Sequence, residues 1–176
     1  MKHIGTLIIA CLFPFIFCSA QASFGVSGGY ATDGIGAHAS YNYETISNGY
    51  FQVSLFASDN ESSVGEVEVP FRTIFLNLGY YHTVVRNRSE QLSLALGGGG
   101  TLGYEILNDG DTILDTGAII AGNEGLVFGG FVGAELQYFF SDSFALLLVE
   151  NTQIYGNSQL GTLSIYAGLG IRFYIN

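Results

Sequence analysis

The chain has 176 residues, of which 25 are glycine, 48% are hydrophobic and 11% are charged. A soluble domain usually carries about 25% charged residues, so this composition argues against an ordinary water-soluble protein. The formal net charge of −10 at pH 7 would repel a polyanion, and it therefore argues against direct binding of nucleic acid. The length suits a single domain with one core.

Residues 1–22 have the features of a secretory signal peptide. A lysine precedes a long apolar run, and small residues follow this run before the next segment begins. We expect cleavage after Ala20 or Ala22, which leaves residues 23–176 as one domain. A lipoprotein site at Cys11 is the alternative. Because both cysteines lie in the signal segment, the mature chain is expected to contain no disulfide and no cysteine metal site.

Apolar residues in the remaining chain recur at every second position, which is typical of strands with one apolar face. The clearest run extends from Leu163 to Ile175. No stretch of this region approaches the 18 or so uninterrupted apolar residues of a spanning helix. Apolar residues change from odd positions up to Phe71 to even positions from Ile74, which predicts a β-bulge near Pro70 to Thr73. The predicted strands are residues 24–30, 37–43, 51–57, 67–84, 92–105, 128–138, 144–149 and 163–175.

The predicted connections alternate between short turns and longer loops. Short turns lie at 46–49, 86–91 and 140–143, and the other set lies at 33–36, 59–66, 106–125 and 156–159. This alternation is typical of an antiparallel transmembrane β-barrel in the outer membrane of a Gram-negative bacterium, with both termini in the periplasm. Eight strands are expected, or ten if the hairpin signal at Asn108 to Asp111 extends the sheet.

The polar face of the predicted strands consists mostly of glycine, serine, threonine, asparagine and tyrosine, and the mature chain has no lysine. A soluble barrel of lipocalin type would need many charges on that face. We therefore expect the polar face to point inward and the apolar face to contact outer-membrane lipid. Eight strands leave a lumen just wide enough for side chains, so no permanent pore is expected. The expected interior residues are Phe56, Phe75, Phe131 and Tyr166, packed against Gly97 and Gly99.

Charged residues on the inward face of the predicted strands are few, which makes them informative. Glu135, Glu150 and Arg172 lie on three consecutive strands. One arginine could neutralise carboxylates that would otherwise be buried alone. We predict that these three residues form a structural charge network inside the barrel.

Three further motifs suggest chemistry, but their contexts do not support it. Gly98 to Gly103 matches the dinucleotide-binding fingerprint without the helix that must follow it. Asn108 to Asp111 resembles the start of a calcium loop that no glutamate closes. Neither a cofactor nor a metal ion is therefore expected. His38 and Ser40 leave one enzymatic alternative open, an outer-membrane lipid hydrolase.

The span from Leu92 to Asn176 resembles the TraO family of conjugative transposons, found in Bacteroides-type mating systems. The resemblance rests on LGGGGTLGYE at 96–105, FVGAEL at 131–136 and the ending GLGIRFYIN at 168–176. It implies a component of the conjugation apparatus with other transfer proteins as partners, and it supplies no catalytic residues. We therefore expect a non-enzymatic transfer component. A general surface barrel for adhesion or envelope anchoring is the alternative.

Overall fold

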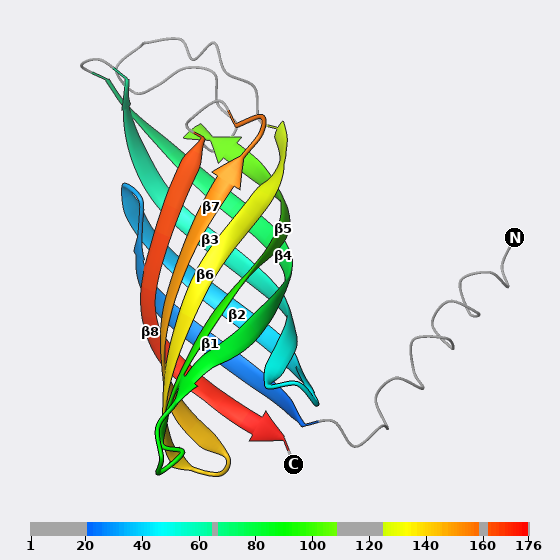
Figure 1. Ribbon diagram of the computed structural model, residues 1–176. Helices are drawn as coiled ribbons and strands as arrows, with labels where there is room; N and C mark the ends of the chain where they lie inside the picture. Colours follow the sequence, from blue (N-terminus) through cyan, green and yellow to red (C-terminus); the bar gives the residue numbers. More distant parts are fainter. Residues whose placement is uncertain (1–20, 65–66, 109–124, 159–161, 176) are drawn as a thin grey trace, which may run out of the picture.

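The computed structural model describes residues 21–64, 67–108, 125–158 and 162–175. Within these ranges eight antiparallel strands close into one barrel (Figure 1). The strands are β1 (Ala22–Ala31), β2 (Gly34–Thr45), β3 (Gly49–Val64), β4 (Val67–Arg86), β5 (Leu92–Leu107), β6 (Gly125–Ser141), β7 (Phe144–Tyr155) and β8 (Leu163–Ile175). The predicted eight-stranded antiparallel barrel is confirmed. The predicted extra hairpin falls on residues 109–111, which lie outside the described residues.

The two ends of the barrel differ in their connections. Ala22 pairs with Ile175, so both ends of the described chain lie at one end, which we call the terminal end (Figure 1). The connections 46–48, 87–91 and 142–143 lie at the terminal end. The connections 32–33, 65–66, 108–124 and 156–162 lie at the opposite end, which we call the loop end. The two longest connections are therefore both at the loop end, as the sequence predicts.

The hairpin of β3 and β4 is longer than the sequence pattern indicates. The connection predicted from Asp59 to Glu66 is wrong over most of its length, because β3 continues to Val64. Its backbone pairs with β4 as far as the partners Val64 and Val67. A polar run can continue a strand when the neighbouring strand supplies the backbone hydrogen bonds, so the residue types alone gave no sign of this extension.

The bulge predicted near Pro70 to Thr73 is also wrong. Pairing between β3 and β4 is continuous there, and Val69 and Thr73 are both buried on the inward face. The apparent change of parity arises because apolar residues line the inside near the loop end, whereas farther down β4 they cover the outside. The irregularities of register occur instead between Thr83 and Val85 and between Phe139 and Ser141.

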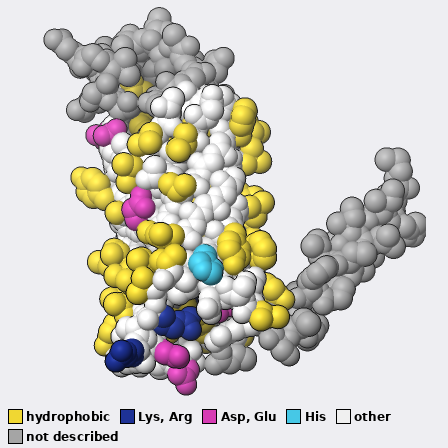
Figure 2. Space-filling model, viewed as in Figure 1, with side chains coloured by type: hydrophobic (Ala, Val, Ile, Leu, Met, Phe, Trp, Pro, Cys, Tyr) yellow, Lys and Arg dark blue, Asp and Glu magenta, His cyan; other side chains and the backbone are white. Residues whose placement is uncertain are grey.

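Outward positions along the strands carry large apolar side chains that are exposed at the barrel wall (Figure 2). On β8, for example, Leu169 and Ile171 are exposed, while Gly168 before them and Arg172 after them are buried. Among the residues that the structure describes, no helix is long and apolar enough to cross a membrane. The exposed apolar side chains lie on the strands, and on β5, β6 and β8 they occupy the face that the sequence predicts.

The lumen is filled by aromatic side chains that lie over glycines. The four predicted interior residues, Phe56, Phe75, Phe131 and Tyr166, are at most 3% exposed. A Cβ atom on Gly97 would lie 2.4 Å from Cγ of Tyr81, and one on Gly103 would lie 2.0 Å from Cδ1 of Phe75. Glycine is therefore needed where a ring packs over the backbone of the neighbouring strand. Side chains therefore fill much of the lumen, as expected for an eight-stranded barrel.

Candidate functional site

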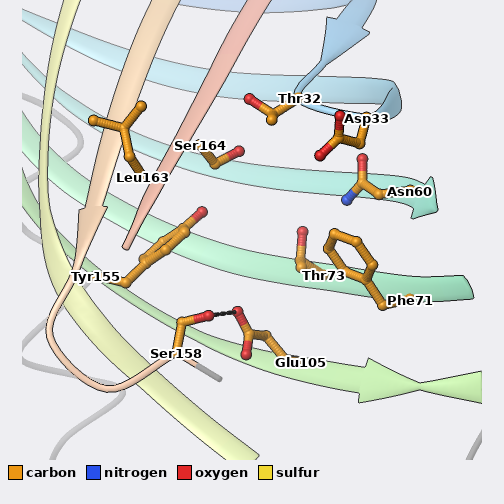
Figure 3. A pocket seen from close by; sticks show the side chains of 10 residues that line it. All are labelled: Thr32, Asp33, Asn60, Phe71, Thr73, Glu105, Tyr155, Ser158, Leu163 and Ser164. Carbon is orange, nitrogen blue, oxygen red and sulfur yellow. Dashed lines mark hydrogen bonds between the residues drawn. The ribbon is translucent and has the colours of Figure 1, made fainter. Parts of the chain in front are cut away.

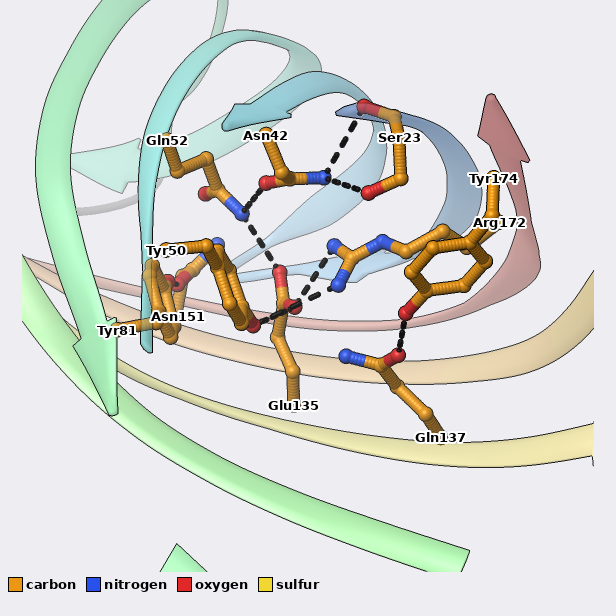
Figure 4. A network of polar contacts seen from close by, with 10 residues as sticks. All are labelled: Ser23, Asn42, Tyr50, Gln52, Tyr81, Glu135, Gln137, Asn151, Arg172 and Tyr174. Atoms are coloured by element: carbon orange, nitrogen blue, oxygen red, sulfur yellow. Dashed lines mark hydrogen bonds and ion pairs between the residues drawn. The ribbon is translucent and has the colours of Figure 1, made fainter. Parts of the chain in front are cut away.

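A salt bridge inside the barrel joins β8 to β6. Arg172 Nη2 lies 2.7 Å from Glu135 Oε2, and the two side chains are 1% and 0% exposed. The carboxylate also accepts hydrogen bonds from the hydroxyl of Tyr50 and, at 2.8 Å, from Nε2 of Gln52 (Figure 4). The Arg172 guanidinium lies 5.3 Å from the centroid of the Tyr50 ring, within the range of a cation–π contact. The buried charges are therefore both paired and hydrogen-bonded, as a low-dielectric interior requires.

The network continues from Gln52 to the first two strands. The side-chain amide of Asn42 lies 2.9 Å from Nε2 of Gln52 and 3.2 Å from Oγ of Ser23. These contacts join β1, β2 and β3 to the central ion pair. Figure 4 shows the side chains converging from around the barrel. The network therefore connects strands that are not neighbours in the sheet.

Tyrosines extend this polar region on either side. The rings of Tyr50 and Tyr81 stack with centroids 5.3 Å apart, and the Tyr81 hydroxyl donates to Oδ1 of Asn151 at 2.9 Å. The hydroxyl of Tyr174 donates to Oε1 of Gln137. Sequence reasoning missed Tyr50 and Gln52. Only Gln52 could have been recognised from the sequence, because it is a polar residue between outward apolar residues of a predicted strand.

Glu150 is not part of the network, and the prediction that it lies inside the barrel is wrong. Its neighbours Val149 and Asn151 are buried on the inward face of β7, so Glu150 points outward. Its carboxylate accepts a hydrogen bond from Oγ1 of Thr152 at 2.8 Å. The segment from Phe144 to Val149 is apolar on both faces, and alternation therefore could not indicate which face is inward. Of the three predicted residues, the structure brings together Glu135 and Arg172.

His38 and Ser40 both lie inside the barrel, each 2% exposed. Within the described part of the chain, neither ring nitrogen of His38 nor the hydroxyl of Ser40 has a hydrogen-bond partner. A serine nucleophile needs a hydrogen bond to its base, and a lipid substrate would need access to both groups. The geometry therefore gives no support to the lipid hydrolase alternative.

A small pocket of about 50 Å³ lies at the loop end (Figure 3). Glu105 and Ser158 meet at one side of it, where Oγ of Ser158 donates to Oε1 of Glu105 at 2.7 Å. Asp33 and Asn60 lie at another side (Figure 3). This volume has room for a few water molecules. Among the described residues, no group of three or more His, Cys, Asp or Glu side chains is placed to hold a metal ion.

Solved structures with a similar fold identify the class of protein. A major outer membrane protein of Thermus thermophilus matches with a TM-score of 0.66 at 10% identity, covering 90% of this chain and 100% of that one. Neisserial surface protein A matches with a TM-score of 0.60 at 12% identity, covering 88% and 95%. Ail, the attachment invasion locus protein of Yersinia pestis, matches with a TM-score of 0.58 at 14% identity, covering 90% and 100%. The fold is that of an outer-membrane β-barrel.

The family is identified by sequence. The profile described as conjugative transposon protein TraO matches residues 31–175, which is most of the chain. The protein therefore belongs to the TraO family, as the motifs in β5, β6 and β8 indicate. A search of curated proteins finds no significant match.

Proposed function

We propose that the protein is a non-enzymatic outer-membrane component of a conjugative DNA-transfer apparatus and that it acts through contacts with other transfer proteins. The observation that carries this proposal is membership of the TraO family over residues 31–175. The filled lumen supports a contact role, because aromatic rings and the ion pair of Glu135 and Arg172 occupy the space that a nucleic-acid strand would need.

The proposed orientation places the terminal end in the periplasm and the loop end outside the cell. Its support is the asymmetry of the connections, since barrels of this class have short periplasmic turns and longer external loops. At the loop end, Asp33 and Glu61 are exposed. Asp59 is paired with Arg72 at 3.5 Å. The positive charge of Arg72 therefore offsets part of the negative charge of Asp59. A surface with excess carboxylates favours a basic protein partner over DNA.

Deleting the gene in donor cells is expected to abolish or strongly reduce the number of transconjugants, and supplying the intact chain from a plasmid should restore it. The reason is that a missing envelope component interrupts contact between transfer proteins. Mating counts with and without the plasmid provide the measurement. Undiminished transfer would contradict the conjugation role and leave the general surface barrel as the better assignment.

The mature protein is expected to begin at Gln21, which corresponds to cleavage after Ala20. The carbonyl of Gln21 accepts a hydrogen bond from the backbone N–H of Glu44 at 3.0 Å, and Ala22 is the first residue of β1. Cleavage after Ala22 would remove this hydrogen bond and the first residue of β1. The intact mass of protein purified from outer membranes distinguishes the two sites, and a mature chain that begins at Ser23 would contradict this prediction.

A further inference from the structure

Glu150 places a carboxylate within the apolar outer wall of the barrel. On β7 the outward residues on either side of Glu150 and its partner Thr152 are Leu148 and Ile154, which are 44% and 52% exposed. On the neighbouring strands, Val132 and Ile165 are the register partners of Thr152 and are also exposed. Glu150 thus lies near the middle of β7, with exposed apolar side chains before and after it on the outward face of this strand.

The outer surface immediately beside this carboxylate carries only small side chains. The register partners of Glu150 are Ala134 on β6 and Ala167 on β8, both on the outward face. Farther across the wall, Gly100 and Gly130 face each other on β5 and β6 without side chains. Another protein could therefore approach the backbone of β6 closely and reach Glu150.

An ionisable side chain that faces lipid is costly, and such residues usually contact protein, water or one another. The hydroxyl of Thr152 is the one hydrogen-bond donor that the described residues give to Glu150. A single hydroxyl leaves most of the acceptor capacity of a carboxylate unused. Glu150 is therefore poorly suited to contact with lipid, and well suited to a donor on another protein.

We propose that the outward face around Ala134, Glu150 and Ala167 is a docking surface for a different protein embedded in the same membrane, one that places a basic side chain against Glu150. Charge complementarity is the argument, because a cation both neutralises the carboxylate and donates hydrogen bonds to it. This inference adds a contact surface to the proposed function but does not rest on it.

A second copy of the chain does not fit this surface. If two copies met through the same face, they would bring the two Glu150 carboxylates towards each other. The arginines of a second copy are also not placed to meet Glu150. Arg172 is inside the lumen, Arg72 is paired with Asp59 at the loop end, and Arg86 and Arg88 lie at the terminal end.

His82 on β4 does face outward, but it lies three strands away from Glu150 along one row of register partners. Such rows climb along the barrel because the strands are tilted. His82 and Glu150 are therefore at different depths, and two parallel copies side by side bring together residues of equal depth.

The first test measures the isolated protein. Purified Glu150→Leu in lipid vesicles is expected to unfold at a higher urea concentration than the native chain, because an apolar side chain replaces a carboxylate in the lipid-facing wall. The matched control Leu148→Glu should unfold at a lower concentration. A lower midpoint for Glu150→Leu would overturn the proposal, since Glu150 would then serve the barrel itself.

The second test measures the contact in cells that carry the complete set of transfer genes. A photo-reactive phenylalanine at Ala134 is expected to form an adduct with a different protein, and the same group at Ala57, an outward alanine on β3, provides the matched control. The adduct should be lost with Glu150→Leu and largely lost with Glu150→Gln, which keeps the size but removes the charge.

An adduct with the mass of two copies, or an adduct whose yield does not depend on Glu150, would overturn the proposal. Full yield with Glu150→Gln would overturn the assignment of a basic partner. Adducts are scored separately from transconjugants, so the two proposals can fail independently. If transfer does not need the gene but the adduct still depends on Glu150, the docking surface is supported and the conjugation role is not.

Discussion

Replacing Arg172 with alanine is expected to destabilise the folded barrel by about 3–5 kcal/mol, because the change leaves Glu135 buried without its counter-charge. Glu135 is 0% exposed and lies 2.7 Å from the guanidinium in the native chain. Tyr50 and Gln52 would still donate to the carboxylate, but neutral donors do not replace a full positive charge. The unfolding midpoint in urea, followed by the gel mobility of unheated samples, provides the measurement.

Arg86→Ala is the control for this prediction. Arg86 is exposed near the terminal end, where the loss of a charge should change stability by less than about 1 kcal/mol. Adding Glu135→Gln to Arg172→Ala should recover part of the lost stability, because the unpaired buried charge disappears. Equal and negligible effects of Arg172→Ala and Arg86→Ala would show that the ion pair does not stabilise the barrel.

The ion pair could be predicted from the sequence because its two residues lie on strands with clear alternation. In β6 and β8 the apolar residues mark the outward face, so Glu135 and Arg172 had to point inward. The first part of β7 is apolar on both sides, and Glu150 was therefore assigned to the wrong face. Periodicity determines a face only where the two faces differ in polarity.

The partners of the ion pair were harder to predict than the pair itself. Tyr50 stands next to Gly49 at the start of β3, where a tyrosine is equally compatible with a membrane interface or with the lumen. Which polar side chains reach Glu135 depends on how the strands are staggered around the closed barrel. Alternation along one strand carries no information on that stagger, so the network of Tyr50, Gln52 and Asn42 required the three-dimensional structure.

Two levels of the lumen are closed by different means. Towards the terminal end, the charged and polar network of Arg172 and Glu135 crosses the interior. Towards the loop end, an apolar cluster that includes Phe56, Phe75 and Tyr155 fills the space. The rings of Phe75 and Tyr155 stack with centroids 4.9 Å apart. Because both levels are filled, the surfaces that remain available for function are the two ends and the outer wall.

Gly99→Ala is expected to destabilise the barrel by about 3 kcal/mol or more, or to prevent its assembly, because overpacking against a rigid neighbour cannot be relieved locally. A Cβ atom at Gly99 would lie 2.0 Å from the carbonyl oxygen of Leu78 and 2.5 Å from Cα of Gly79. Both atoms belong to the backbone of β4, so no rotation of a side chain makes room. The two strands would have to separate at this point.

Gly100→Ala on the same strand provides the matched control. Its Cβ atom would point outward, and the nearest atom, the carbonyl oxygen of Gly129, would be 4.0 Å away. This change should leave stability unaltered or raise it by up to about 1 kcal/mol, since alanine restricts the unfolded chain more than glycine does. Refolding yield into lipid vesicles and the urea midpoint measure both variants.

Because neighbouring residues of a strand point to opposite faces, a one-residue slip of β5 would exchange the two results. A tolerated Gly99→Ala together with a damaging Gly100→Ala would therefore contradict the face assignment on which the filled lumen depends.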